Sequence, residues 1–145
     1  MSLTDPFGLA RFKAAQQSVF ATALAELRAG RKQTHWMWFI FPQLRGLGRS
    51  PTAQQYGISS IEEARAYLDE PILGERLRLA TAATLSVEDL SATAIFGSPD
   101  DMKFRSSMTL FSVVAATQAG SLFQSALDRY FAGVPDEQTL LLLKI

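Results

Sequence analysis

The sequence predicts a mainly α-helical protein in which residues 1–145 form one compact domain. Three observations lead to this prediction. Residues that start helices and glycines that end them recur along the chain, apolar residues follow the helical period, and the alternation typical of strands is nearly absent. A length of 145 residues also suits a single domain that buries its own core without disulfides or structural metal ions. We therefore expect about six to eight helices.

The expected helices cover residues 12–29, 60–70, 71–85, 86–97, 98–120, 121–133 and 136–145. The first is rich in alanine, keeps its large apolar residues near one face and ends before Gly30, a typical helix end. The second opens with Ser60 and has Glu63 three residues later, which is the spacing of a capping box. Pro71 fits the first turn of the third, since proline is tolerated there.

The remaining helices carry similar end signals. Ser86 caps the fourth expected helix and Gly97 ends it. In the fifth, Ser98 is the expected cap, Pro99 is the first helical residue and Gly120 is the end. The last two helices each begin with a capping residue of their own. These signals place helices over most of the C-terminal half.

An aromatic run, HWMWFIF over residues 35–41, is the ambiguous part of the chain. Short apolar runs do not separate a buried strand from a buried helical turn, so a short strand or hairpin near 36–58 stays open beside a helix. Pro42 ends the run in either case, because the residue before a proline is pushed out of the helical region. Glycine and arginine then dominate, and the composition of 45–51 predicts a loop.

This block is the first candidate binding site. Tryptophan faces can stack on a planar ring, glycines let a backbone approach a ligand, and arginines bind phosphate. His35 can act as an acid or a base near neutral pH. The alternatives are a hydrophobic core followed by a plain turn. The candidate ligand-binding residues here are His35, Trp36, Trp38, Phe41, Gln43, Arg45, Gly46, Gly48, Arg49 and Ser50.

The helix over 98–120 carries the second candidate. Lys103 and Ser107 are four residues apart and so share one face, and Ser106 lies beside them. Serines are poor residues for a helix interior, because their hydroxyl groups compete for backbone hydrogen bonds. A polar notch that faces a ligand explains them, and so does close packing between helices. We expect this helix and the aromatic block to meet in space, since each breaks local sequence rules.

The charge and the composition of the chain limit the kinds of partner that we expect. Residues 1–50 contain seven Lys/Arg and two Asp/Glu, a net charge of +5, and residues 51–145 carry −5. The halves can attract each other, or the basic half can meet a small anionic ligand; nucleic acid is not expected, because a basic excess over the whole domain is lacking. The chain has no cysteine and one histidine, so we expect neither a metal site nor a cofactor. Without a signal peptide or an apolar run of about 20 residues, we expect a soluble, cytoplasmic protein and no membrane partner.

Three long blocks read HWMWFIFPQLRGLGRSPTAQQYGI, EARAYLDEPILGERL and IFGSPDDMKFRSSMTLF. They resemble, in order, the signature segments of a bacterial family, the domain of unknown function 1810, and span nearly the whole chain. The family's usual histidine-proline pair before ILG is Glu70-Pro71 here. This resemblance implies a family and no activity, because none is established for it.

The order of these blocks is also similar, more distantly, to NADAR domains. The matching residues are Phe41, Pro42, Ser60, Glu63, Tyr67, Lys103, Ser107 and Met108. The resemblance implies a ligand derived from ADP-ribose and cleavage of a glycosidic bond. Glu63 would then be the catalytic acid or base, as carboxylates are in glycoside hydrolysis, with Tyr67 in the binding site. Helix capping alone also explains Glu63.

Two classes of function follow. The first is a binder or hydrolase of a small phosphorylated, nucleotide-like ligand of the ADP-ribose type, with the aromatic residues around the ring and arginine and lysine on the phosphate. The second is a non-catalytic helical module that docks a partner or forms a homo-oligomer through exposed apolar faces.

Overall fold

A computed structural model describes residues 5–115 and 121–144 of the chain. These residues form ten helices, and none of them combines the length and the hydropathy that a membrane-spanning segment needs. The helices are α1 (Ala10–Gln17), α2 (Phe20–Ala29), α3 (Met37–Ile40), α4 (Pro51–Tyr56), α5 (Ile61–Asp69), α6 (Pro71–Leu85), α7 (Ala92–Phe96), α8 (Asp100–Val114), α9 (Leu122–Phe131) and α10 (Glu137–Leu143). The helical class is therefore as expected.

The expected number of six to eight helices is too low. One reason is a break inside the segment 12–29, where Ser18 and Val19 separate α1 from α2 without a glycine or proline to mark it. The other is the segment 36–58, which forms two short helices, α3 and α4. Of the two alternatives left open there, the described residues form the helical one, and a single parallel bridge, which joins Leu44 to Ile58, takes the place of a strand or hairpin.

Several helix ends follow their signals and others do not. Gly30 ends α2 in the left-handed conformation, and the Ser60 hydroxyl caps α5 by accepting from the Glu63 amide. Ser86 instead ends α6, and Ser91 caps the short helix α7. The expected cap Ser98 is also wrong, because α8 starts without a side-chain cap; Gly120 lies outside the described residues.

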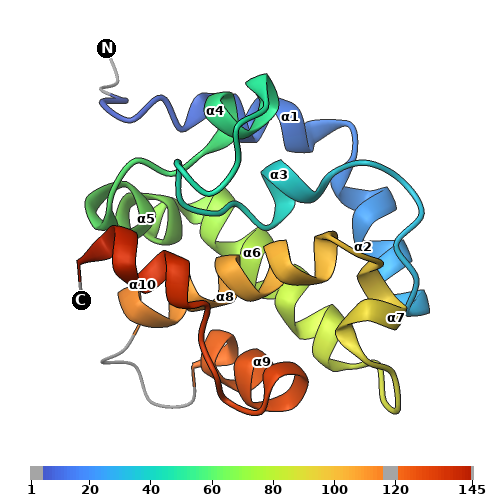
Figure 1. Cartoon of the computed structure of the whole chain (residues 1–145). Coiled ribbons are helices and arrows are strands. Elements are labelled where there is room, and N and C mark those ends of the chain that lie inside the picture. Colours follow the sequence, from blue (N-terminus) through green and yellow to red (C-terminus); the bar gives the residue numbers. More distant parts are fainter. Residues whose placement is uncertain (1–4, 116–120, 145) are drawn as a thin grey trace.

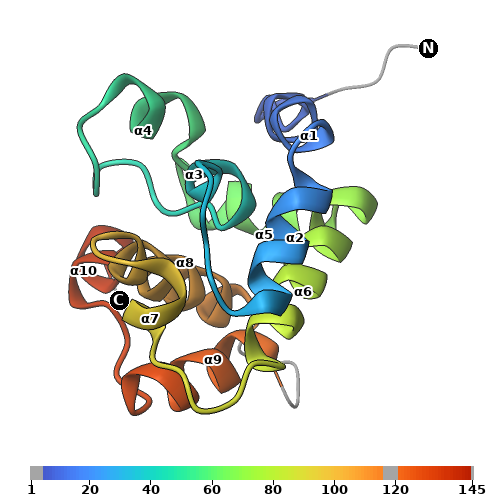
Figure 2. The same cartoon turned by 90° about the vertical axis from the view of Figure 1, so that its right-hand side faces the viewer.

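Helices α6 and α8 organise the packing (Figure 1). Figures 1 and 2 both show α1, α3 and α4 at one end of the molecule and α9 at the other. Helix α8 packs against α5, α7, α9 and α10, and α6 packs against α2, α5 and α9. These two long helices thus lie between the short N-terminal helices and α9.

Aromatic rings fill the space between these helices. Phe104 of α8 is fully buried, with its ring centroid 4.6 Å from that of Phe96 and 5.0 Å from that of Phe41. Tyr67 is also fully buried; its ring packs edge-on against Phe12 and its hydroxyl accepts a hydrogen bond from the Gln16 amide. Buried aromatic pairs of this kind dominate core energetics. Phe41 and Tyr67, expected at a ligand, therefore lie in the core.

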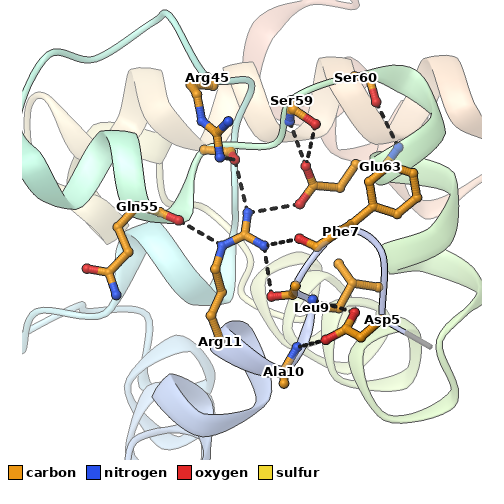
Figure 3. Close-up of polar contacts among 12 residues, drawn as sticks. Asp5, Phe7, Leu9, Ala10, Arg11, Arg45, Gln55, Ser59, Ser60 and Glu63 are labelled. Atoms are coloured by element: carbon orange, nitrogen blue, oxygen red, sulfur yellow. Dashed lines mark hydrogen bonds and ion pairs between the residues drawn. The ribbon is translucent and has the colours of Figure 1, made fainter. Parts of the chain in front are cut away.

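A buried ion pair joins α1 to α5. Arg11 Nη2 lies 2.9 Å from Glu63 Oε2, and the Glu63 side chain is only 2% exposed. Figure 3 shows the Arg11 guanidinium at the centre of a ring of acceptors. Besides Glu63, it donates to the backbone carbonyls of Phe7, Gly8, Gln55 and Gly57. One side chain thus ties the N-terminal segment to the loop that precedes α5.

The second Glu63 oxygen completes this arrangement. Glu63 Oε1 accepts from the amide and the hydroxyl of Ser59, at 2.8 and 2.7 Å. The expected capping box is thus half formed, because the carboxylate binds Ser59 and not the Ser60 amide. A buried charge with these partners is stable only while they are present, since an unpaired ion in the interior carries a large desolvation cost.

We expect Glu63→Gln to lower the free energy of unfolding by roughly 3 kcal/mol, because it leaves the Arg11 charge without its counter-ion. Chemical denaturation followed by circular dichroism measures this loss. Glu62→Gln, at the exposed neighbouring position, is the matched control and should change the stability by less than about 0.5 kcal/mol. Equal stabilities for the two variants would contradict the structural role of the pair.

Candidate functional site

Two hollows in the surface share Trp38 and Lys103. The smaller has a volume of about 370 Å³, and the larger about 590 Å³. Ligand sites commonly fall within this range of volumes. The smaller hollow is lined by Lys32, His35, Trp36, Met37, Trp38, Phe39, Thr52, Asp100 and Lys103. The larger is lined by Trp38, Gln43, Leu47, Gly48, Arg49, Ser50, Pro99, Met102, Lys103, Ser106, Asp136 and Gln138.

The shared pair is a cation over an aromatic ring. The Lys103 ammonium lies 4.5 Å from the centroid of the Trp38 ring. Trp38 comes from α3 and Lys103 from the first turns of α8, so the aromatic block and the second candidate segment do meet, as expected. An ammonium at this distance is attracted by the ring's negative face. The contact holds both side chains at the boundary between the two hollows.

A single carboxylate holds two lysines at this place. Asp100 lies 2.9 Å from Lys32 and 3.1 Å from Lys103. Burial raises the pKa of Asp100, but the two lysine hydrogen bonds and charges outweigh it, and the pKa is lowered overall. Asp100 is therefore ionised near neutral pH. The three groups together carry a net positive charge facing the smaller hollow.

The loop 31–36 that brings Lys32 here is held by another carboxylate. Glu26 accepts hydrogen bonds from the amides of Gln33 and Thr34, from the Thr34 hydroxyl and from the Trp36 indole. Burial raises the pKa of Glu26, but these hydrogen bonds prevail and lower it to about 2. Trp36 is almost fully buried, so its indole N–H depends on this partner. Glu26 thus fixes one wall of the smaller hollow.

Close packing sets the position of the Trp38 ring. A Cβ atom on Gly48 would lie 2.9 Å from Trp38 Cη2 and 2.8 Å from the Ala53 Cβ. Any larger residue would displace the indole or the start of α4. The loop can approach the ring this closely only because residue 48 has no side chain. The conformational freedom of glycine is not needed at this position. The Ser50 hydroxyl caps α4 next to it.

The model of one family, described as a protein of unknown function (DUF1810), matches residues 6–143. The chain belongs to this family. It is also similar to the crystal structure of the conserved hypothetical protein Rv1873 from Mycobacterium tuberculosis, with 50% identity and a TM-score of 0.93 over 97% of this chain and 99% of that one. No curated protein matches. None of these findings shows the more distant similarity to NADAR domains.

In this DUF1810 protein, the hollows unite nine of the expected site residues, and six others lie elsewhere. The nine are His35, Trp36, Trp38, Gln43, Gly48, Arg49, Ser50, Lys103 and Ser106, of which Trp38 and Lys103 line both hollows. Of the six, Phe41, Tyr67 and Ser107 are buried, Glu63 is ion-paired, and Arg45 and Gly46 lie near α10. Arg45 donates to the carbonyls of Gln54 and Gly57, so it supports its own loop.

Sequence reasoning missed several lining residues. Lys32 had no local signal, because its role arises from Asp100, which lies far away in the sequence. Asp100, the first residue of α8, carries no sequence signal that pairs it with Lys32. Asp136 and Gln138 reach the larger hollow from α10 and its cap. Among the described residues, no three His, Cys, Asp or Glu side chains gather as they would around a metal ion.

We expect acid to destabilise the protein partly through Glu26. Because folding lowers this pKa from 4.5 to about 2, the stabilisation is complete above about pH 4.5 and is lost as the pH falls toward 2. Glu26→Gln should therefore show a shallower decline of the free energy of unfolding across this window, as measured by denaturation at several pH values. Glu88→Gln, at an exposed position, is the control; an unchanged slope for Glu26→Gln would contradict this role.

Proposed function

We propose that the protein binds a small phosphorylated ligand that contains a planar ring, such as ADP-ribose or another nucleotide, across the two hollows. The observation that carries this proposal is the Lys103 ammonium over the Trp38 ring at the point where the hollows join. Positive charge and an aromatic face side by side suit a ligand that has both an anionic group and a ring.

The charges around this pair favour an anion. Lys32 and Lys103 share Asp100 as their counter-ion, so one positive charge is left over. On the other side, Arg49 is exposed, lines the larger hollow and makes no ion pair with a described residue. Arginine binds phosphate through two parallel hydrogen bonds, and lysine through a point charge. Phosphates bound at Lys103 would lie where the two hollows join, with Arg49 on the lining of the larger one.

The same geometry favours binding over hydrolysis. The Glu63 carboxylate, the expected acid or base, lines neither hollow and has both oxygens occupied within the fold. Of the carboxylates that do line them, Asp100 is held ionised by two lysines and Asp136 caps α10. A general acid needs a pKa near the working pH, and the lowered pKa of Asp100 is unsuited to that role. The proposal is therefore a binding protein.

An interaction module is the second candidate, because α10 and the segment before it expose large apolar side chains. Val134, Leu141 and Leu142 are 52%, 60% and 45% exposed. Leu141 and Leu142 are consecutive residues, and neighbouring apolar side chains on a surface can mark a contact site for another protein. We expect Leu141→Glu to shift a self-associating protein toward monomer in sedimentation velocity. A wild-type protein that is monomeric at high concentration would contradict a homo-oligomer.

For the ligand site, we expect Lys103→Ala to raise the Kd for ADP-ribose by about tenfold or more, because it removes a charge-assisted contact worth about 1.5–3 kcal/mol. Arg49→Ala should act in the same direction. Isothermal titration calorimetry measures both, with circular dichroism to confirm folding.

Arg65→Ala is the matched control for these variants, since Arg65 is exposed on α5 and lines neither hollow. It should leave the Kd unchanged. If the wild-type protein binds neither ADP-ribose nor AMP in the millimolar range, the proposed function is wrong.

A further inference from the structure

Gln43 is a buried polar side chain without a hydrogen-bond partner in the described part of the chain. It is only 5% exposed, and it lines the larger hollow. The carboxamide can accept at its oxygen and donate twice from its nitrogen. The other glutamine buried in the described core, Gln16, bonds through its side chain to Phe39, Tyr67 and Arg76. The buried, unpaired side-chain atoms of the described residues lie elsewhere, so the unbonded carboxamide of Gln43 opens onto the hollow and is available to a ligand there.

The backbone around Gln43 is fixed on both sides. Pro42 precedes it, the Gln43 carbonyl accepts from the Ile58 amide at 2.9 Å, and the next residue but one, Arg45, donates its amide to the Ile58 carbonyl at 2.7 Å. These two bonds form the bridge between Leu44 and Ile58. A side chain on a rigid backbone presents its polar atoms at a fixed position, which is what recognition of a ligand requires.

The groups that share the hollow with Gln43 suit a flat ring. Trp38 offers an aromatic face, and Pro99 and Met102 offer apolar surface on the α8 side. Met102 is 44% exposed, as a side chain at the mouth of a hollow would be. Lys103 and Arg49 lie on the same lining and can contact an anionic group attached to that ring. An amide that meets the ring's edge completes the set of contacts.

We propose that Gln43 is the specificity-determining residue of the site and that it reads the edge of a nucleobase, with adenine as the base that fits. This inference rests on the proposed function, because it places the ring of the nucleotide-like ligand in the larger hollow. A carboxamide pairs with a ring edge on which a donor and an acceptor lie side by side, and adenine presents its 6-amino group beside a ring nitrogen.

The chemistry of a buried amide explains why such a contact would discriminate. A ligand with the matching edge satisfies both the carbonyl and the amino group of Gln43. A ligand that lacks one partner covers the amide and leaves a polar atom of it unpaired, and a site built around a hydrogen bond rejects such a ligand more strongly than an apolar site rejects a misfit. The phosphate contacts would be the same for both ligands. The difference in affinity therefore measures only the contact between Gln43 and the edge of the ring.

The experiment compares AMP with the ribonucleotide of unsubstituted purine, which lacks the 6-amino group. Calorimetric titration of the wild-type protein should show a Kd for AMP that is about tenfold lower or more. Gln43→Leu should lower that ratio to near one. Gln17→Leu, which changes an exposed glutamine that lines neither hollow, should preserve it.

The outcomes separate this inference from the proposed function. Equal affinity of the wild-type protein for both nucleotides overturns the role of Gln43, whereas the proposed nucleotide site still holds. Binding of neither nucleotide overturns both. A preference for AMP that survives in Gln43→Leu assigns the recognition to another group and also overturns the inference. Should circular dichroism show that Gln43→Leu is unfolded, Gln43→Met, which keeps the length and removes the amide, provides the same test.

Discussion

The buried charge of Glu63 is the constraint on which the arrangement of the N-terminal half depends. Its partner Arg11 donates to carbonyls of the segments before α1 and before α5, and the Gly57 carbonyl accepts from Arg45 as well. Arg11 and Arg45 in this way hold the C-terminal end of α4, and the loop before α4 carries Gly48, which packs on the Trp38 ring. The ion pair thus fixes one end of α4, and the two hollows lie at the other.

Two further carboxylates position the residues that line the two hollows. Glu26 holds the loop 31–36 through backbone and indole donors, and Asp100 holds Lys32 and Lys103 together. In each case an anion that is partly removed from water gathers donors that include residues outside its own helix. The same principle thus explains the ionised carboxylates, the clustered lysines and the fixed position of Trp36. Because Asp100 gathers two lysines, the surroundings of the hollows are basic although the chain as a whole is neutral.

The sequence predicted the helical class, most helix positions and the meeting of the aromatic block with the start of α8. These features depend on the helical spacing of apolar residues, on the residues that begin and end helices, and on residue types that stand out in the sequence. It did not predict the break at Ser18, because no glycine or proline marks it, nor the partner of Glu63, which lies 52 residues away. The pairing of Lys32 with Asp100 was equally hidden, since an ion pair made across the fold has no local pattern, whereas Gln43 was already among the candidate binding residues.

The bonds of Arg11 also have a consequence for the order of folding. Three of its acceptors lie 44 to 52 residues away in the sequence, whereas α8 and α9 are near neighbours along the chain and pack closely. Contacts at long sequence separation close late, because the chain entropy lost on loop closure must first be offset. We expect α1 to dock last and to detach first, which amide hydrogen exchange would reveal as early exchange confined to α1. The C-terminal helices would then serve as the template on which the N-terminal segment is assembled.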